Sequence, residues 1–91
     1  MFARFNHRQV PTEQLDDILQ IYRDKVAPDR LAQKGNKGAY VFVDRNAGKI
    51  IGVSLWETEA DMNAAQLPTD VDNATGSKAT VETYEVVVAG E

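Results

Sequence analysis

Two neighbouring segments of this sequence are apolar at nearly every position, and they constrain the fold more than any other feature. Ala39–Val43 and Ile50–Trp56 are rich in β-forming residues. The segment between them carries Asn46 and Gly48, which suit left-handed turn positions, so the sequence predicts a β-hairpin. Strands without polar alternation predict a sheet that is covered on both faces. A chain of 91 residues cannot cover both faces by itself, and we therefore expect self-association.

A long amphipathic helix is predicted ahead of this hairpin. From Leu15 to Val26 the apolar residues recur at the three- and four-residue spacing of one helical face. The helix should begin near Glu13 with Thr12 as its N-cap. We expect a break or kink near Ala27, because proline follows at the next position.

The two ends of the chain complete the pattern. Residues 2–9 alternate loosely and residues 80–88 are β-forming, which predicts a first and a last strand. Residues 57–66 favour a second helix, with Thr58 as a cap and Pro68 ending it. Residues 69–78 are polar and predict a loop.

The resulting order β-α-β-β-α-β predicts one α+β domain over residues 1–91 with a ferredoxin-like fold. This fold is a four-stranded antiparallel sheet with both helices on one face. The other face stays bare in a single chain, so we expect a homodimer in which two sheets pack face to face.

Composition excludes several classes of function. The net charge is −4 and the basic residues form no run with interleaved aromatics, which argues against nucleic acid as a partner. The absence of cysteine and the single histidine, His7, argue against a transition-metal site. No apolar stretch is long enough to span a membrane, and Arg4 and Arg8 do not fit a signal peptide, so we expect a cytoplasmic protein without a membrane partner.

The chain resembles the antibiotic biosynthesis monooxygenase family of dimeric α/β-barrel proteins over nearly its whole length. The resemblance depends on residues 2–6 at the start of the first strand and on residues 35–44 leading into Gly48 and Lys49. Its most specific part is residues 51–62, a strand that ends in Leu-Trp-Glu and leads into an acidic helix start.

This resemblance implies a site between the sheet and the helices. Asn6 and Trp56 match family positions whose side chains donate hydrogen bonds to a developing oxyanion in a reaction that needs no cofactor. Strand parity places Arg4 and Arg8 on the same face as Asn6, and Arg4 could orient a substrate anion. Further candidates for binding the substrate are Tyr22, Met62 and Gln66. Each of these residues also has a structural interpretation, with Trp56 as a core anchor and Asn6 bonded locally.

The resemblance implies a cofactor-independent monooxygenase that acts on a small aromatic or quinol-type molecule. The alternative is a non-catalytic, ligand-binding or stress-associated dimer with the same fold. Haem binding is disfavoured, since the helix histidine that ligates iron in haem-degrading relatives has no counterpart after Trp56.

Overall fold

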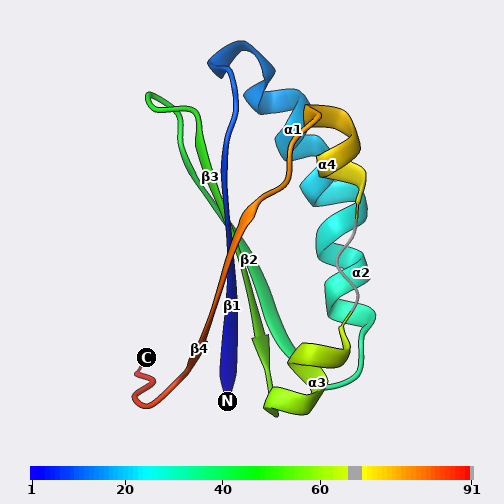
Figure 1. Ribbon diagram of the computed structural model, residues 1–91, viewed down its shortest axis with the longest axis vertical. Helices are drawn as coiled ribbons and strands as arrows, with labels where there is room; N and C mark the ends of the chain where they lie inside the picture. The colour runs from blue at the N-terminus through cyan, green and yellow to red at the C-terminus, as the bar shows by residue number, and fades with distance from the viewer. Residues whose placement is uncertain (66–68, 91) are drawn as a thin grey trace.

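A computed structural model describes residues 1–65 and 69–90 of the chain. A four-stranded antiparallel sheet forms one layer, and all the helices cover the same face of it (Figure 1). The strand order is β2-β3-β1-β4, which confirms the predicted α+β fold. The strands are β1 (Phe2–Gln9), β2 (Asn36–Asp44), β3 (Lys49–Trp56) and β4 (Thr80–Glu85).

The hairpin is present as predicted, but β2 begins at Asn36, before the predicted start at Ala39. Gly48 adopts a positive φ of 68° in the turn, while Asn46 does not take the left-handed conformation expected of it. The backbone N–H of Val10 donates to the Gly48 carbonyl at 2.9 Å, which ties the turn to the end of β1.

The first helical segment runs without a gap from Thr12 to Ala32. It comprises η1 (Thr12–Gln14), α1 (Leu15–Ile21), η2 (Tyr22–Val26) and α2 (Ala27–Ala32). The predicted kink appears as the wider π-helical segment η2, which precedes Pro28; proline lacks the N–H that an α-helix would use at this point. Thr12 does not cap the helix, because η1 begins at Thr12 itself after Pro11, without a side-chain cap.

Two short helices follow β3. In α3 (Glu59–Ala64) the predicted cap is confirmed, since Thr58 Oγ1 accepts a hydrogen bond from the Asp61 N–H at 3.0 Å. The loop predicted over residues 69–78 is wrong in part: it contains α4 (Asp70–Thr75), which Gly76 ends with a φ of 71°. Val71 explains this helix, because it is buried against α1 and η2 in the core.

The core lies between the helices and the helix-covered face of the sheet. It is formed by Val10, Leu15, Ile18, Tyr22, Ile50 and Val71. The strand register places alternate residues of β1 on this face, with Arg4 opposite Ser54, Asn6 opposite Gly52 and Arg8 opposite Ile50.

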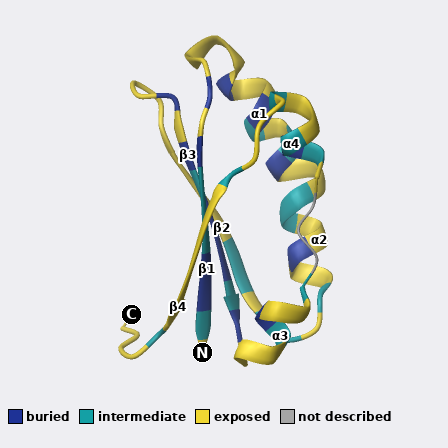
Figure 2. Ribbon diagram, in the orientation of Figure 1, coloured by how far each residue is buried: buried dark blue, intermediate teal, exposed yellow. Residues whose placement is uncertain are grey.

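The opposite face of the sheet has no helix over it, and β2 and β4 are largely exposed (Figure 2). Tyr40, Phe42 and Tyr84 on this face are each more than half exposed. The expectation that one chain leaves an apolar sheet face uncovered is therefore confirmed for the described residues. None of the helices in that part of the chain is long and apolar enough to cross a membrane.

Candidate functional site

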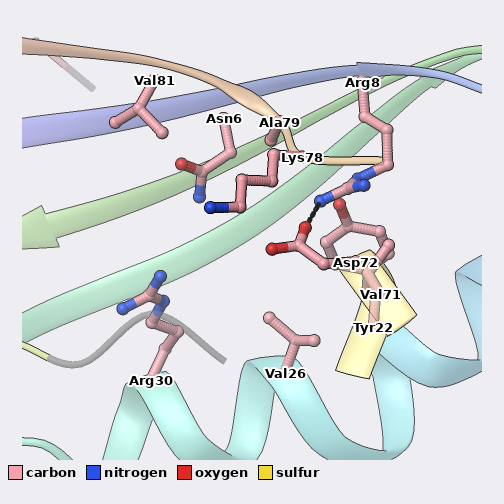
Figure 3. Close-up of a pocket in the computed structure, with 10 residues that line it drawn as sticks. All are labelled: Asn6, Arg8, Tyr22, Val26, Arg30, Val71, Asp72, Lys78, Ala79 and Val81. Carbon is pink, nitrogen blue, oxygen red and sulfur yellow. Dashed lines mark hydrogen bonds and ion pairs between the residues drawn. The ribbon is translucent and has the colours of Figure 1, made fainter. Parts of the chain in front are cut away.

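A pocket of about 160 Å³ opens between the helix-covered face of the sheet and the helices (Figure 3). We call it the sheet–helix pocket. The residues that line it are Asn6, Arg8, Tyr22, Val26, Arg30, Val71, Asp72, Lys78, Ala79 and Val81. An engineered cavity of roughly 150 Å³ in another protein holds benzene, so this volume suits a single aromatic ring.

Asn6 reaches the pocket from the middle of β1 (Figure 3). Its Oδ1 is buried and has no hydrogen-bond partner among the described residues. An unpaired buried amide oxygen costs free energy, which a bound donor would recover. Rotation of the side chain by half a turn would instead present the two N–H donors of the amide.

Tyr22 and the valines supply an apolar wall. The Tyr22 side chain is only 5% exposed and comes from the start of η2. Val26, one turn later on the same segment, and Val71 from α4 lie beside it in Figure 3. This wall fits the flat, apolar body of an aromatic molecule.

The pocket carries more positive than negative charge. Arg8, Arg30 and Lys78 line it, whereas Asp72 is the one carboxylate among its described lining residues. Arg30 is 3% exposed and lies at the pocket's edge on α2 (Figure 3). Burial lowers the pKa of the Arg30 guanidinium, the positive charge of Arg4 lowers it further, and the nearby carboxylate of Asp29 partly offsets both effects.

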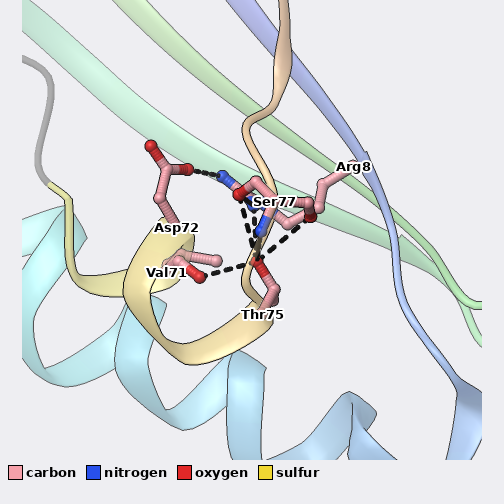
Figure 4. A network of polar contacts seen from close by, with 5 residues as sticks. All are labelled: Arg8, Val71, Asp72, Thr75 and Ser77. Atoms are coloured by element: carbon pink, nitrogen blue, oxygen red, sulfur yellow. Dashed lines mark hydrogen bonds and ion pairs between the residues drawn. The ribbon is translucent and has the colours of Figure 1, made fainter.

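Arg8 and Asp72 form an ion pair that joins β1 to α4 (Figure 4). Arg8 Nη1 also donates to Thr75 Oγ1 at 2.9 Å and to the Ser77 carbonyl at 2.8 Å. Sequence reasoning placed Arg8 on the correct face but assigned it no partner, because Asp72 is 64 residues away. The network fixes one wall of the pocket.

Arg4 lies two residues from Asn6 on the same face and is 7% exposed. Its Nη2 donates to the Met62 carbonyl at 2.7 Å, which ties β1 to α3. Nε and Nη1 are buried without a hydrogen-bond partner in residues 1–65 and 69–90. Burial lowers the pKa of this guanidinium.

Trp56 is completely buried at the end of β3, and its indole N–H donates to Ser54 Oγ at 3.0 Å. It is not among the described residues that line the sheet–helix pocket. Asn6 pairs with Gly52, four positions back along β3 from Trp56, which corresponds to about 13 Å along the strand. The structure therefore places these two predicted residues on one face without bringing them together.

The remaining predicted residues lie elsewhere. The Met62 side chain is buried and lines a separate hollow with Phe2, Glu59 and Thr83. Gln66 lies outside the described residues. Lys78 and Arg30, which sequence reasoning did not select, line the pocket instead. No pattern in the sequence marks them, because they are 48 positions apart.

Haem does not fit the residues of this pocket. The helix histidine that the resemblance implies as the iron ligand has no counterpart, and the one histidine of this chain, His7, lies on the uncovered face of the sheet. There its Nε2 contacts Glu82 Oε1 at 2.6 Å, and Tyr84 donates to the other Glu82 oxygen. In the described part of the chain, no group of three His, Cys, Asp or Glu side chains gathers to hold a metal ion.

No family model matches the chain. An uncharacterized protein from two strains of Mycobacterium tuberculosis is 33% identical over 66 residues. The match covers 72% of this chain and 30% of each relative, so it spans less than a third of those proteins.

Solved structures match this chain over its whole length. A candidate antibiotic biosynthesis monooxygenase from Deinococcus radiodurans matches with a TM-score of 0.80 and 16% identity, over 100% of this chain and 97% of that one. The haem degrader MhuD from Mycobacterium tuberculosis, solved with two haems in its active site, matches with a TM-score of 0.78 and 15% identity over 100% of both chains. The predicted resemblance is thus confirmed for the fold, and this chain has the fold of the antibiotic biosynthesis monooxygenases.

Proposed function

We propose that the protein is a monooxygenase-like enzyme that oxidises a small, single-ring quinol in the sheet–helix pocket without a cofactor. The observation that carries this proposal is the Asn6 amide oxygen, which is buried and has no hydrogen-bond partner among the described residues, in a pocket sized for one ring. The fold that the chain shares with monooxygenases supports it. A second copy would cover the bare sheet face, and we propose that the working form is a homodimer.

The cations of the pocket help to generate the reactive form of the substrate. Positive charge near a phenolic hydroxyl lowers its pKa and favours the electron-rich phenolate. Arg30 and Lys78 supply that charge next to the apolar wall. As electrons move from the phenolate to dioxygen, the same cations and an amide N–H of Asn6 stabilise the negative charge that develops on oxygen.

The reaction balances without an external reductant. One atom of dioxygen forms a bond to a ring carbon, which loses its hydrogen. The O–O bond breaks and the second oxygen atom leaves as water. The quinol supplies all the electrons and leaves as a hydroxyquinone.

Oxygen uptake with hydroquinone, measured on chelator-treated protein, tests this proposal. Removal of an oxyanion donor costs about 10²-fold or more in rate, so we expect Asn6→Ala to lower uptake by that factor. Asn46→Ala, in the exposed hairpin turn, is the matched control and should behave as the unmodified protein. Absence of uptake, or equal uptake in Asn6→Ala, would contradict the proposal.

The second candidate is a non-catalytic protein that binds a small ligand in the same pocket. The hydrogen bond from Trp56 to Ser54 favours it, because this bond occupies one of the two donors that the resemblance implies for catalysis. Binding of hydroquinone without any oxygen uptake would support this candidate.

A further inference from the structure

The uncovered face of the sheet carries three titratable side chains that contact one another, away from the sheet–helix pocket. His7 Nε2 lies 2.6 Å from Glu82 Oε1, and the Tyr84 hydroxyl donates to Glu82 Oε2 at 2.6 Å. The Phe5 ring stacks beside His7 and meets Tyr84 edge-on, with ring centroids 6.5 and 5.6 Å apart. We call His7, Glu82 and Tyr84 the face cluster. It joins β1 to β4 within an aromatic surface.

Water solvates the face cluster in a single chain. The side chains of His7 and Glu82 are 29% and 45% exposed, and no helix covers this face (Figure 2). Anything that covers the face removes this water. A carboxylate taken out of water raises the free energy of the complex unless a cation pairs with it. The protonation of His7 therefore decides how well the face can be covered.

The charges on this face suit a second copy of the chain as the covering partner. The strand register places Asp44 directly opposite Lys49, and Glu82 contacts His7. Each acidic group on these strands thus faces a basic group of its own chain, and the face is neutral when His7 is protonated. A two-fold dimer sets the same patch against itself, which requires a patch without net charge. A strongly charged partner would find no complement here.

The surroundings of His7 identify the groups that act on its charge. On β4, Thr80 lies opposite His7 and Glu82 contacts it. On β3, Ile51 lies opposite His7, and Lys49 lines a shallow hollow with it. Lys49 is exposed, whereas Glu82 is in direct contact, so the carboxylate is the main influence.

The Glu82 carboxylate stays ionised in the neutral pH range. The hydrogen bond from Tyr84 lowers the pKa of the Glu82 carboxyl, and His7 lowers it further, against an opposing effect of desolvation. The change in charge near neutral pH must then come from the imidazole, since histidine ordinarily titrates between about pH 5 and 8.

We infer that the face cluster makes self-association of this protein pH-dependent, because the interface accepts Glu82 only when His7 is protonated. The inference rests on the homodimer of the proposed function. Dimer formation then takes up protons wherever His7 of the free chain is neutral. As the pH rises through the histidine range, each chain brings an uncompensated carboxylate into the interface, and the dimer weakens.

Sedimentation equilibrium at pH 6 and pH 8, at fixed ionic strength, tests the inference. Uptake of up to one proton per chain should raise the dimer dissociation constant about tenfold or more between these two values. A dimer with the same dissociation constant at both pH values would overturn the inference and leave the homodimer standing. A monomer at both would overturn the two together. Oxygen uptake is not the readout, so absence of oxygenase activity would not affect the result.

Two variants assign the effect to the cluster. Glu82→Gln removes the carboxylate, so protonation of His7 should now oppose association and the pH dependence should reverse. His7→Gln keeps a hydrogen-bond donor but cannot be protonated, and its dimer should be weak at both pH values. The matched control is Glu85→Gln, an exposed carboxylate at the end of β4 whose register position is on the opposite face. Unchanged pH dependence in Glu82→Gln, or its loss in Glu85→Gln, would contradict the assignment.

Discussion

At the scale of single residues, the hydrogen bond from the Trp56 indole N–H to Ser54 determines whether this N–H is available to a substrate. The indole is completely buried, and its N–H is satisfied by a hydroxyl two residues away on the same strand face. We predict that Ser54→Ala lowers the free energy of unfolding by about 1–3 kcal/mol, because it leaves a buried donor unpaired. Denaturant unfolding checks this, with the exposed Ser77→Ala as a control expected to lie within about 0.5 kcal/mol of the parent.

Oxygen uptake by Ser54→Ala and by Trp56→Phe distinguishes the two interpretations of Trp56, as a core anchor or as a hydrogen-bond donor to the reacting oxygen. If Trp56 anchors the core, oxygen uptake per folded molecule should be unchanged in Ser54→Ala. Trp56→Phe should then affect stability more than uptake. A loss of about 10²-fold in uptake for Trp56→Phe would instead assign the indole N–H to the reacting oxygen.

At the scale of elements, the Arg8–Asp72 ion pair holds α4 on the sheet (Figure 4). The Arg8 side chain is 5% exposed and that of Asp72 is 29% exposed, so solvent screens the pair only in part. Removal of one partner of a buried pair costs about 3–5 kcal/mol, and we predict a loss near the lower limit of this range for Asp72→Asn. Asp16→Asn, which removes an exposed ion pair with Arg45, should cost about 1 kcal/mol or less. Thermal unfolding of the two variants measures the difference, and equal losses would show that the pair does not anchor α4.

At the scale of the whole molecule, the uncovered sheet face should determine the oligomeric state. Tyr40, Phe42 and Tyr84 expose apolar surface there, and monomeric proteins seldom leave such a patch in water. We predict a dimer in light scattering at micromolar concentration and a monomer for Phe42→Glu, whose charge would be buried without a partner. Leu31→Glu, which alters an exposed leucine on α2, should remain a dimer. A monomeric parent protein would contradict the face-to-face arrangement.

Local patterns were sufficient to predict most of the elements. The apolar spacing of the first helix, the hairpin with Gly48 and the Thr58 cap all depend on neighbours within a few residues, and each is present. The resemblance implied that Asn6 faces the helices, and the period of two in a strand was enough to place Arg4 and Arg8 on the same face as Asn6. Helix α4 was missed because its six residues are too short to show a helical period, and its burial of Val71 depends on α1.

The sequence by itself thus determined the order of the four strands and of the helices other than α4, the α+β fold and the shared face of Arg4, Asn6 and Arg8, because these follow from short-range sterics, hydrogen bonding and side-chain periodicity. Only the tertiary structure decided the composition of the candidate site. It brought Arg30 and Lys78 to the edge of one pocket and paired Arg8 with Asp72. It also buried the Trp56 indole and formed its hydrogen bond to Ser54. Apart from that last bond, these contacts join residues far apart in the chain, and no local pattern carries the information about which distant side chains meet.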